Sequence, residues 1–396
     1  MAKKSLICGL DIGTFKIKIL GILKKGEDLE VVFQFEEKSE GVRKGVVVDP
    51  ERLSQILKEF FLKIKKDTGF SPNSVFCNID GAHLFSLLSR GVIVVSRADQ
   101  KISEEDVQRV IQAAQAVSLS SNKEVFETIP IEFSIDGEKG IKDPVGLGGV
   151  KLEADVLILG GFSPYIRNLE KAVLNSGLEI ADVIPSPLAA SKSCLTQKQK
   201  ELGVALIDIG AATTGLSVFK DEDLIQMMIL PIGSAGITNE IAINLKTDVE
   251  IAEKIKTEFG TCLFKGKDKR ERIEIGEEEP LIFSLRSLNR VIEKGILRIF
   301  FEVEKELKKI SKEKFLPAGI VLTGGGAKIP KIQGLAKRKF KLPVKIGRPK
   351  GIPGLDDPSF SVASGLVLEC IETEKEKVLE PGFFSKIKRV FKIFLP

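Results

Sequence analysis

The chain opens with two short apolar runs separated by a tight turn. Residues 6–23 hold both runs, and the sequence Asp-Ile-Gly lies between them. In the second run Ile17 and Ile19 alternate with lysines, which is the period-two pattern of a half-buried strand. This pattern predicts a β-hairpin at the start of the chain.

Strand patterns alternate with helical patterns along the rest of the sequence. Further strands are expected at residues 31–36, 74–79, 86–96, 124–135, 152–159, 180–184, 204–208, 214–219 and 318–323. Helices are expected to start near residues 50, 103 and 163 and to cover 188–195, 238–245, 249–259 and 285–310. The charged segment 266–279 is either a loop or a short hairpin. This alternation predicts an α/β protein.

The turn motif of the first hairpin occurs twice. Asp-Ile-Gly stands at residues 11–13 and again at 208–210, each time between two predicted strands. A single copy would be read as an ordinary hairpin turn, but two copies in matching contexts indicate two related halves.

Each copy has the chemistry of a phosphate-binding loop. A glycine lets the backbone turn so that amide N–H groups point into a concavity, and small hydroxyl side chains follow it. An aspartate beside a phosphate requires a cation between them, and a carboxylate that holds Mg²⁺ through water suits this position. The candidate residues are Asp11, Gly13 and Thr14 in the first loop, and Asp208, Gly210, Thr213 and Thr214 in the second.

A third glycine-rich element follows a buried strand. Residues 320–323 are apolar up to a threonine, and Gly324, Gly325 and Gly326 come directly after it. Glycines at such a strand end allow a ribose or a flat ring to approach the backbone. Alone this cluster would be read as a loop, but together with the two turns it predicts a nucleotide cleft.

Composition excludes several other classes of protein. The 396 residues are 43% hydrophobic and 29% charged, so the chain is folded and large enough for two or three domains. Five cysteines without a Cys-x-x-Cys pair and a single histidine argue against a disulfide scaffold and against a zinc or histidine-cluster metal site. Of the net charge of +5, four positive charges fall in residues 383–396, so the body is nearly neutral and no nucleic-acid partner is expected.

The order of these elements resembles a known fold. A strand–turn–strand loop, a second one in the other half of the chain and then a strand ending in glycines are similar to the actin, heat-shock chaperone and sugar-kinase ATPases. Within that superfamily the chain resembles the FtsA family of bacterial division actins. The resemblance is carried by residues 78–83, 89–92, 101–107, 136–137, 143–147 (Asp-Pro-Val-Gly-Leu) and 151–154 (Lys-Leu-Glu-Ala).

The resemblance implies a division of the chain into four subdomains and a tail. Residues 1–83 and 162–195 would form the core subdomain 1A, and an inserted subdomain 1C would occupy 84–161. The second half would consist of core subdomain 2A, at 196–232 and 316–370, and small subdomain 2B, at 233–315. A linker at 371–382 would lead to a terminal helix at 383–396.

The resemblance also implies ATP and Mg as ligands. It adds Lys16, Gly233, Glu253 and Lys256 to the candidate nucleotide contacts; for Glu253 and Lys256 an ordinary solvated helix pair is the alternative. Ser186 stands where other bacterial actins carry a glutamate that orients the attacking water. Because serine cannot replace a carboxylate in this role, ATP hydrolysis is expected to be slow at most.

The C-terminal segment 383–396 has the pattern of an amphipathic helix. At the helical spacing of about 100° per residue the large apolar side chains share one face and the basic ones lie opposite, which is typical of a helix lying in a membrane interface. The candidate membrane contacts are Phe383, Phe384, Ile387, Lys388, Arg389, Val390, Phe391, Lys392, Phe394 and Leu395. A terminal helix packed on the body is the alternative.

The function implied by the resemblance is bacterial cell division. An FtsA-like protein would form filaments on the cytoplasmic face of the cell membrane at the division site, bind anionic lipid, hold the tail of the tubulin-like protein FtsZ and help recruit other divisome proteins. The FtsZ tail is expected on Arg286, Asn289, Arg290, Lys294 and Arg298 of the long helix, unless these form only a solvated basic face. The alternatives are a PilM-like pilus assembly protein and a small-molecule kinase of the same fold.

Overall fold

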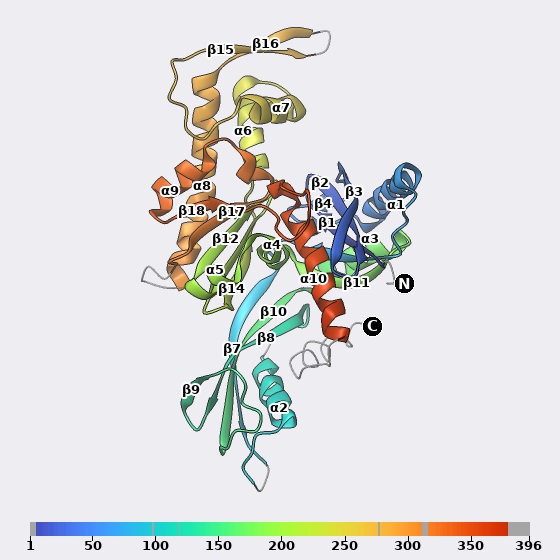
Figure 1. The fold of residues 1–396 in the computed structure, drawn as a ribbon. Coiled ribbons are helices and arrows are strands. Elements are labelled where there is room, and N and C mark those ends of the chain that lie inside the picture. The colour runs from blue at the N-terminus through green and yellow to red at the C-terminus, as the bar shows by residue number, and fades with distance from the viewer. Residues whose placement is uncertain (1–4, 97–98, 118, 276–277, 311–315, 379–396) are drawn as a thin grey trace.

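The computed structural model describes residues 5–96, 99–117, 119–275, 278–310 and 316–378. The predicted terminal helix at 383–396 therefore lies outside the described residues. Figure 1 shows two sheets side by side, with one small subdomain at each end of the molecule.

The first sheet has five strands in the order β11-β6-β1-β2-β3. β1 pairs antiparallel with β2, as the sequence predicted, and parallel with β6. The strands are β1 (Ser5–Ile12), β2 (Lys16–Lys25), β3 (Asp28–Lys38), β6 (Ser74–Ile79) and β11 (Glu179–Pro185). Two further short strands, β4 (Val42–Arg43) and β5 (Val46–Val47), form a separate hairpin.

The second sheet repeats this arrangement. Its order is β14-β13-β12-β17-β18, again an antiparallel three-strand meander followed by two parallel strands. The strands are β12 (Val204–Ile209), β13 (Thr214–Lys220), β14 (Asp223–Leu230), β17 (Gly319–Thr323) and β18 (Val344–Ile346). The prediction of two related halves from the repeated turn motif is confirmed.

Helices cover the sheets and connect the halves. α1 (Pro50–Thr68) begins where Asp49 caps it by accepting from the Arg52 amide, and it ends at Gly69 with a φ of 76°. Its buried face carries Leu53, Leu57, Phe60 and Ile64. The other helices of the two halves are α3 (Ser163–Asn175), α4 (Ser186–Cys194), α5 (Gln197–Leu202), α9 (Ile332–Phe340) and α10 (Ser361–Val378), with short 3-10 turns η1 (Gly325–Lys328) and η2 (Pro358–Phe360).

The helix α10 differs from the expected division of the chain. The sequence assigned residues up to 370 to the second half, whereas Phe360, Ala363 and Val367 pack with Ile7 and Leu20 of the first sheet. Lys192 of α4 also forms an ion pair with Glu369, at 2.9 Å. The apolar pattern of a helix shows which face is buried, but it does not show which sheet the helix covers.

The inserted segment folds as a unit with its own core. Strands β7 (Phe85–Val94), β8 (Lys123–Ile135), β9 (Glu138–Ile141) and β10 (Lys151–Phe162) form a sheet in the order β7-β10-β8-β9, and α2 (Glu104–Gln115) packs on it. Ser103 starts α2 with a reciprocal capping box to Asp106. Gly91 of β7 lies against α2, because a Cβ there would be 2.0 Å from the Val110 carbonyl oxygen.

The second small subdomain lies at the opposite end of the molecule (Figure 1). It contains α6 (Ala235–Leu245), α7 (Val249–Phe259), the hairpin of β15 (Arg270–Ile275) and β16 (Glu278–Ser284), and α8 (Leu285–Ile310). The charged segment for which the sequence allowed a loop or a hairpin is thus a hairpin. Its core joins that of the second sheet through Ile237, Ile292 and Ile296.

The structure contains neither a disulfide nor a membrane-spanning helix in its described part. The five cysteines lie there as thiols, four of them buried. Among the described helices, none has the length and apolarity needed to span a bilayer.

Candidate nucleotide site

The two predicted loops have the same backbone geometry. In the first loop the Gly13 amide donates to the Lys16 carbonyl at 3.1 Å, and in the second the Gly210 amide donates to the Thr213 carbonyl at 2.9 Å. Each loop follows the carboxyl end of the central strand of its sheet, β1 or β12, which also has a parallel neighbour. The repeat in sequence is therefore a repeat in structure, and it gives each half one turn of the same shape.

An asparagine side chain, that of Asn78, forms hydrogen bonds that hold the start of the first loop. The Ile12 amide donates to Asn78 Oδ1 at 2.6 Å, and Asn78 Nδ2 donates to Ser186 Oγ at 2.9 Å. Ser186 Oγ in turn donates to the Ile79 carbonyl at 3.3 Å, and the residue is buried. The hydroxyl of Ser186 is thus used within the protein.

The second loop is held by the start of α6. The Ser234 amide donates to the Gly210 carbonyl at 3.0 Å, and the Ala235 amide donates to the Ala211 carbonyl at 2.7 Å. Gly233 allows this approach, because a Cβ there would be 2.4 Å from the Ala211 oxygen. Thr214 is fully buried and donates to the Ile232 carbonyl at 2.7 Å, so its hydroxyl holds the fold together.

Thr14 and Thr213 connect the loops to the first half. Thr14 Oγ1 accepts from the amide of Gly45, between β4 and β5, at 2.8 Å. Thr213 Oγ1 donates to Oδ2 of Asp80 at 2.9 Å. Asp80 follows β6, so this hydrogen bond joins the second loop to the first half.

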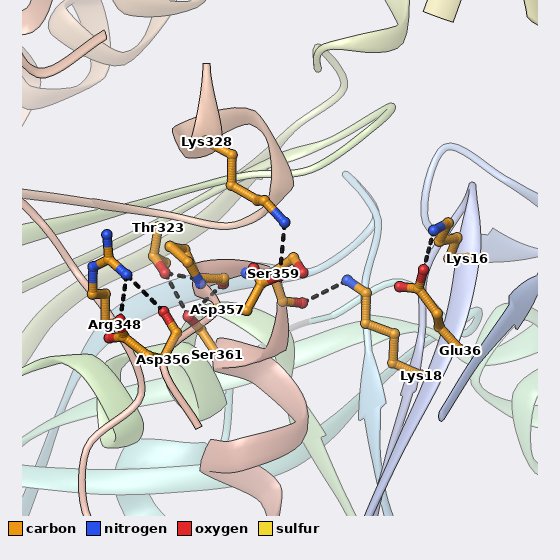
Figure 2. A network of polar contacts seen from close by, with 11 residues as sticks. Lys16, Lys18, Glu36, Thr323, Lys328, Arg348, Asp356, Asp357, Ser359 and Ser361 are labelled. Atoms are coloured by element: carbon orange, nitrogen blue, oxygen red, sulfur yellow. Dashed lines mark hydrogen bonds and ion pairs between the residues drawn. The ribbon is translucent and has the colours of Figure 1, made fainter. Parts of the chain in front are cut away.

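Three aspartates and one lysine share the space between the loops. Asp11 lies opposite Lys18 in the β1–β2 register, and Lys18 Nζ donates to the Ser359 carbonyl at 2.5 Å (Figure 2). Burial raises the pKa of Asp11, although Lys18 opposes this. Burial and then Asp11 and Asp80 raise the pKa of Asp208 to about 7. Burial is also the main cause that raises the pKa of Asp80 to about 6.

This charge pattern fits a cation held through water. Lys18 lowers the pKa of Asp11 and of Asp208, so ionisation of these two and of Asp80 leaves excess negative charge that a divalent cation would offset. Within the described residues no three His, Cys, Asp or Glu side chains come close enough together to hold a metal ion directly. Asp11 and Asp208 are the carboxylates at the two loops that could hold a divalent cation through water.

The three glycines after β17 have different roles. Gly324 has a φ of 83°, and a Cβ there would be 2.1 Å from Asp208 Oδ1. A Cβ at Gly326 would be 2.4 Å from Ile209 Cγ2. Both glycines are therefore required by the packing of η1 on the second loop. A Cβ at Gly325 would meet no described atom within 4 Å, so the fold itself does not require that glycine.

The predicted helix contacts Glu253 and Lys256 form one cluster with Thr238. Lys256 Nζ is 2.6 Å from Glu253 Oε2 and donates to Thr238 Oγ1 at 2.8 Å. Lys256 is buried, and burial lowers its pKa although Glu253 opposes this. Lys256 also lies 3.5 Å from the carbonyl of Ser234, next to the second loop. The two residues are thus an internal ion pair at the edge of the candidate site.

Further polar contacts lie beside the glycine cluster (Figure 2). Lys328 Nζ is 2.7 Å from Asp357 Oδ2, and Thr323 Oγ1 is 2.5 Å from Ser361 Oγ. The predicted contact Lys16 instead pairs with Glu36 on β3. Lys18, two positions further along β2, is the lysine that lies beside Asp11.

Sequence reasoning missed Lys18 and Asp80. The alternation along β2 put both lysines on the same face, and only the β1–β2 register shows which of them meets Asp11. Asp80 belongs to the segment 78–83 that carried the family resemblance. Its position directly after a predicted apolar strand could have indicated a site residue, because ligands often bind at such strand ends.

One residue that the sequence analysis assigned to the partner-binding face, Asn289, is buried in the structure. Asn289 is buried, its Oδ1 accepts from the Thr261 amide at 2.5 Å and its Nδ2 donates to the Leu285 carbonyl at 2.8 Å. The prediction of Asn289 as a docking residue is wrong, because its position on α8 belongs to the buried face with Leu288 and Ile292. The basic residues of that predicted face are not buried, as the expectation required: Arg286, Arg290, Lys294 and Arg298.

Comparison with known proteins identifies the family. The model of the family "Cell division protein FtsA" matches residues 205–365, and that of the "SHS2 domain inserted in FTSA" matches residues 81–159. A cell division protein FtsA from Pseudomonas aeruginosa is 35% identical over 379 residues, which cover 94% of this chain and 90% of that protein. The chain belongs to the FtsA family. The FtsA of Escherichia coli is 31% identical, with 98% of this chain and 97% of that protein covered.

Solved structures share the actin-like fold. The PilM–PilN type IV pilus biogenesis complex matches with a TM-score of 0.66 at 16% identity, covering 92% of this chain and 98% of that chain. MreB5 of Spiroplasma citri bound to ADP matches with a TM-score of 0.57 at 15% identity, covering 95% and 99%. The chain is thus an FtsA-family, actin-like cell-division protein with the inserted domain of that family.

Proposed function

We propose that this FtsA-family protein binds Mg-ATP between its two halves. The observation that carries the proposal is the pair of equivalent loops facing three carboxyl groups, with Gly325 open beside them. Their amides and the Thr14 hydroxyl would bind phosphate oxygens, Thr213 would keep its hydrogen bond to Asp80, and Gly325 would lie against the nucleoside. An actin-like neighbour of the same fold is described as bound to ADP, which supports a nucleotide here.

The bound ATP would turn over slowly. The resemblance to other bacterial actins implies a carboxylate at the position of Ser186, and the Ser186 hydroxyl already bonds to Asn78 and the Ile79 carbonyl. Loss of a general base commonly slows a reaction by about 10²–10⁴-fold. Nucleotide would therefore act mainly by binding, as a ligand that favours one arrangement of the halves.

The cellular role we propose is to link FtsZ to the membrane. A terminal helix at 383–396 would lie in the inner face of the cell membrane, and filaments of many copies would add avidity to an anchor that is weak alone. A neighbour of the same fold, the MamK double helical filament (TM-score 0.51), supports self-assembly. Other divisome proteins would join at the same place.

The FtsZ tail would dock on the basic face of α8 in subdomain 2B. We retain Arg286, Arg290, Lys294 and Arg298 for this face and omit Asn289. Arg298 is 2.8 Å from Glu240 of α6, which leaves Arg290 and Lys294 as the better candidates for a partly acidic peptide.

The test uses the full chain with vesicles of anionic lipid. In the presence of Mg-ATP the protein should sediment with the vesicles and carry a fluorescent FtsZ tail peptide with it. Neutral vesicles should retain much less, since each basic residue contributes about 1 kcal/mol on an anionic surface. If the full chain binds ATP but stays in the supernatant with either vesicle, the membrane role is refuted while nucleotide binding stands.

A further inference from the structure

Asp80 lies at the edge of the sheet where ligands of α/β proteins bind. β6 runs parallel between β1 and β11, so the three strands deliver the first loop, Asp80 and Ser186 to the same edge. In open α/β sheets ligands sit outside the carboxyl ends of the strands. Asp80 is the first residue after β6, and its carboxylate therefore belongs to the site and not to the core beneath it.

Its surroundings place this carboxylate between the two loops. Thr213 of the second loop donates to Oδ2 at 2.9 Å. On the other side is Gly45, whose amide donates to Thr14 of the first loop. A Cβ at Gly45 would be 2.9 Å from both Cγ and Oδ2 of Asp80, so Gly45 is the residue that lets the carboxylate sit this close. Threonines of both loops thus lie on either side of Asp80.

The carboxylate keeps capacity to accept further hydrogen bonds. Oδ1 accepts from the Gly81 amide at 2.8 Å and Oδ2 from Thr213, whereas an ionised carboxylate offers about four acceptor positions. No ion pair joins Asp80 to a lysine or arginine of the described chain within salt-bridge distance. With its pKa raised to about 6, the group is ionised near neutral pH and is still basic enough to take a proton.

We propose that Asp80 orients and deprotonates the water that attacks ATP, in place of the carboxylate that is missing at Ser186; this rests on the proposed nucleotide function. In the step, the water oxygen forms a bond to the γ-phosphorus, and the bond from that phosphorus to the bridging oxygen breaks. ADP leaves with the electron pair of the broken bond. The proton of the water passes to Asp80 and then to solvent. Asp80 is then a catalytic residue, and the Gly81 amide holds its Oδ1 in place.

The competing explanation is that Asp80 only ties the two halves together. Two variants separate the roles. Asp80→Asn keeps an oxygen that can accept from Thr213 but has no negative charge, and Thr213→Val removes the hydrogen bond while keeping the carboxylate. Asp143→Asn is the matched control, because this exposed aspartate lies in the inserted domain, away from the loops, and its Oδ1 accepts only from the nearby Val145 amide in the described structure.

The experiment measures ATP affinity by calorimetry and the rate of phosphate release in a single turnover, with full-length protein in excess over Mg-ATP. We expect Asp80→Asn to bind ATP within about threefold of the natural chain and to hydrolyse it at least about 30-fold more slowly, within the range for a lost general base. Thr213→Val should lose affinity but hydrolyse what it binds, and Asp143→Asn should change the rate by less than about threefold.

Three results would overturn the inference. Asp80→Asn that hydrolyses at the natural rate shows that the charge does no chemistry. If the Asp80→Asn protein no longer binds ATP, the role of Asp80 is to hold the two halves together. The same conclusion follows if Thr213→Val slows hydrolysis as much as Asp80→Asn does. A natural chain that binds ATP but releases no phosphate refutes the catalytic role alone, whereas one that does not bind ATP refutes the proposed function as well.

Discussion

Replacement of Gly325 by valine tests the nucleotide site without disturbing the fold. A Cβ at this position meets no described atom within 4 Å, and its φ lies outside the left-handed region that favours glycine. The folded protein should therefore accept the side chain with little change in stability. A nucleoside lying against this backbone would instead be displaced by the isopropyl group.

The expected loss of affinity follows from the cost of overpacking. Insertion of extra methyl groups into a well-packed contact costs about 1–3 kcal/mol. A tenfold change in the dissociation constant corresponds to about 1.4 kcal/mol. Gly325→Val should thus bind ATP about 5- to 140-fold more weakly, as measured by isothermal calorimetry with Mg-ATP.

Two further glycines serve as comparisons. Gly148 in the inserted domain also has open space around its Cβ position and an ordinary φ, so Gly148→Val should fold and bind ATP normally. Gly326→Ala should lower the free energy of unfolding, because its Cβ would meet Ile209 Cγ2 at 2.4 Å. If Gly325→Val is folded and binds ATP as tightly as the natural chain, the assignment of this backbone to the nucleoside is refuted.

The remaining predictions concern the membrane, the partner and pH. A chain ending at Pro381 should bind ATP but should not sediment with anionic vesicles. The Phe391→Glu variant should also fail to sediment, because the substitution puts a charge on the apolar face of the predicted helix. Normal sedimentation of either protein refutes the membrane anchor. Charge reversal at Arg290 and Lys294 should weaken binding of the FtsZ tail peptide in fluorescence anisotropy, and unchanged affinity excludes this face. Burial raises the pKa of Asp208 to about 7, above its ordinary value near 4, so between these values the folded chain holds a proton that the unfolded chain has lost. Stability of the ligand-free protein should therefore fall as pH rises from about 4 to 7, and Asp208→Asn should remove part of this slope in urea titrations.

The sequence predicted the two halves because the repeat lies in local chemistry. Asp-Ile-Gly between alternating runs specifies a strand, a turn and a strand without any distant contact, and both copies formed as expected. The helix α1 was equally predictable, since its cap, its proline and its apolar spacing are all local. Features of this kind are encoded within one short, continuous stretch of the chain.

What the sequence could not predict depends on contacts between distant segments. Asp80 meets Thr213 across 133 positions, and Gly45 is the residue that makes room beside it. The mistaken placement of Asn289 has a related cause. An asparagine between basic residues is expected to be exposed, and only the folded structure shows that its Oδ1 accepts from the distant Thr261 amide. The expected role of Lys16 stays a prediction, whereas the register placed Lys18 beside Asp11.

The inserted domain contacts both halves. The domain is inserted in the chain of the first half, but it also contacts the second. Ser86, at the start of β7, donates to the Met227 carbonyl at 2.7 Å and accepts from the Met227 amide at 3.2 Å, and Met227 lies on β14, the outer strand of the second sheet. Lys142 forms an ion pair with Asp223 on the same strand. These two contacts lie at different levels along the sheet of the domain, because Ser86 pairs with Leu159 whereas Ile141, next to Lys142, lies at the level of Ala154. A change of angle between the halves would therefore load the domain along much of its length, so its position depends on both halves.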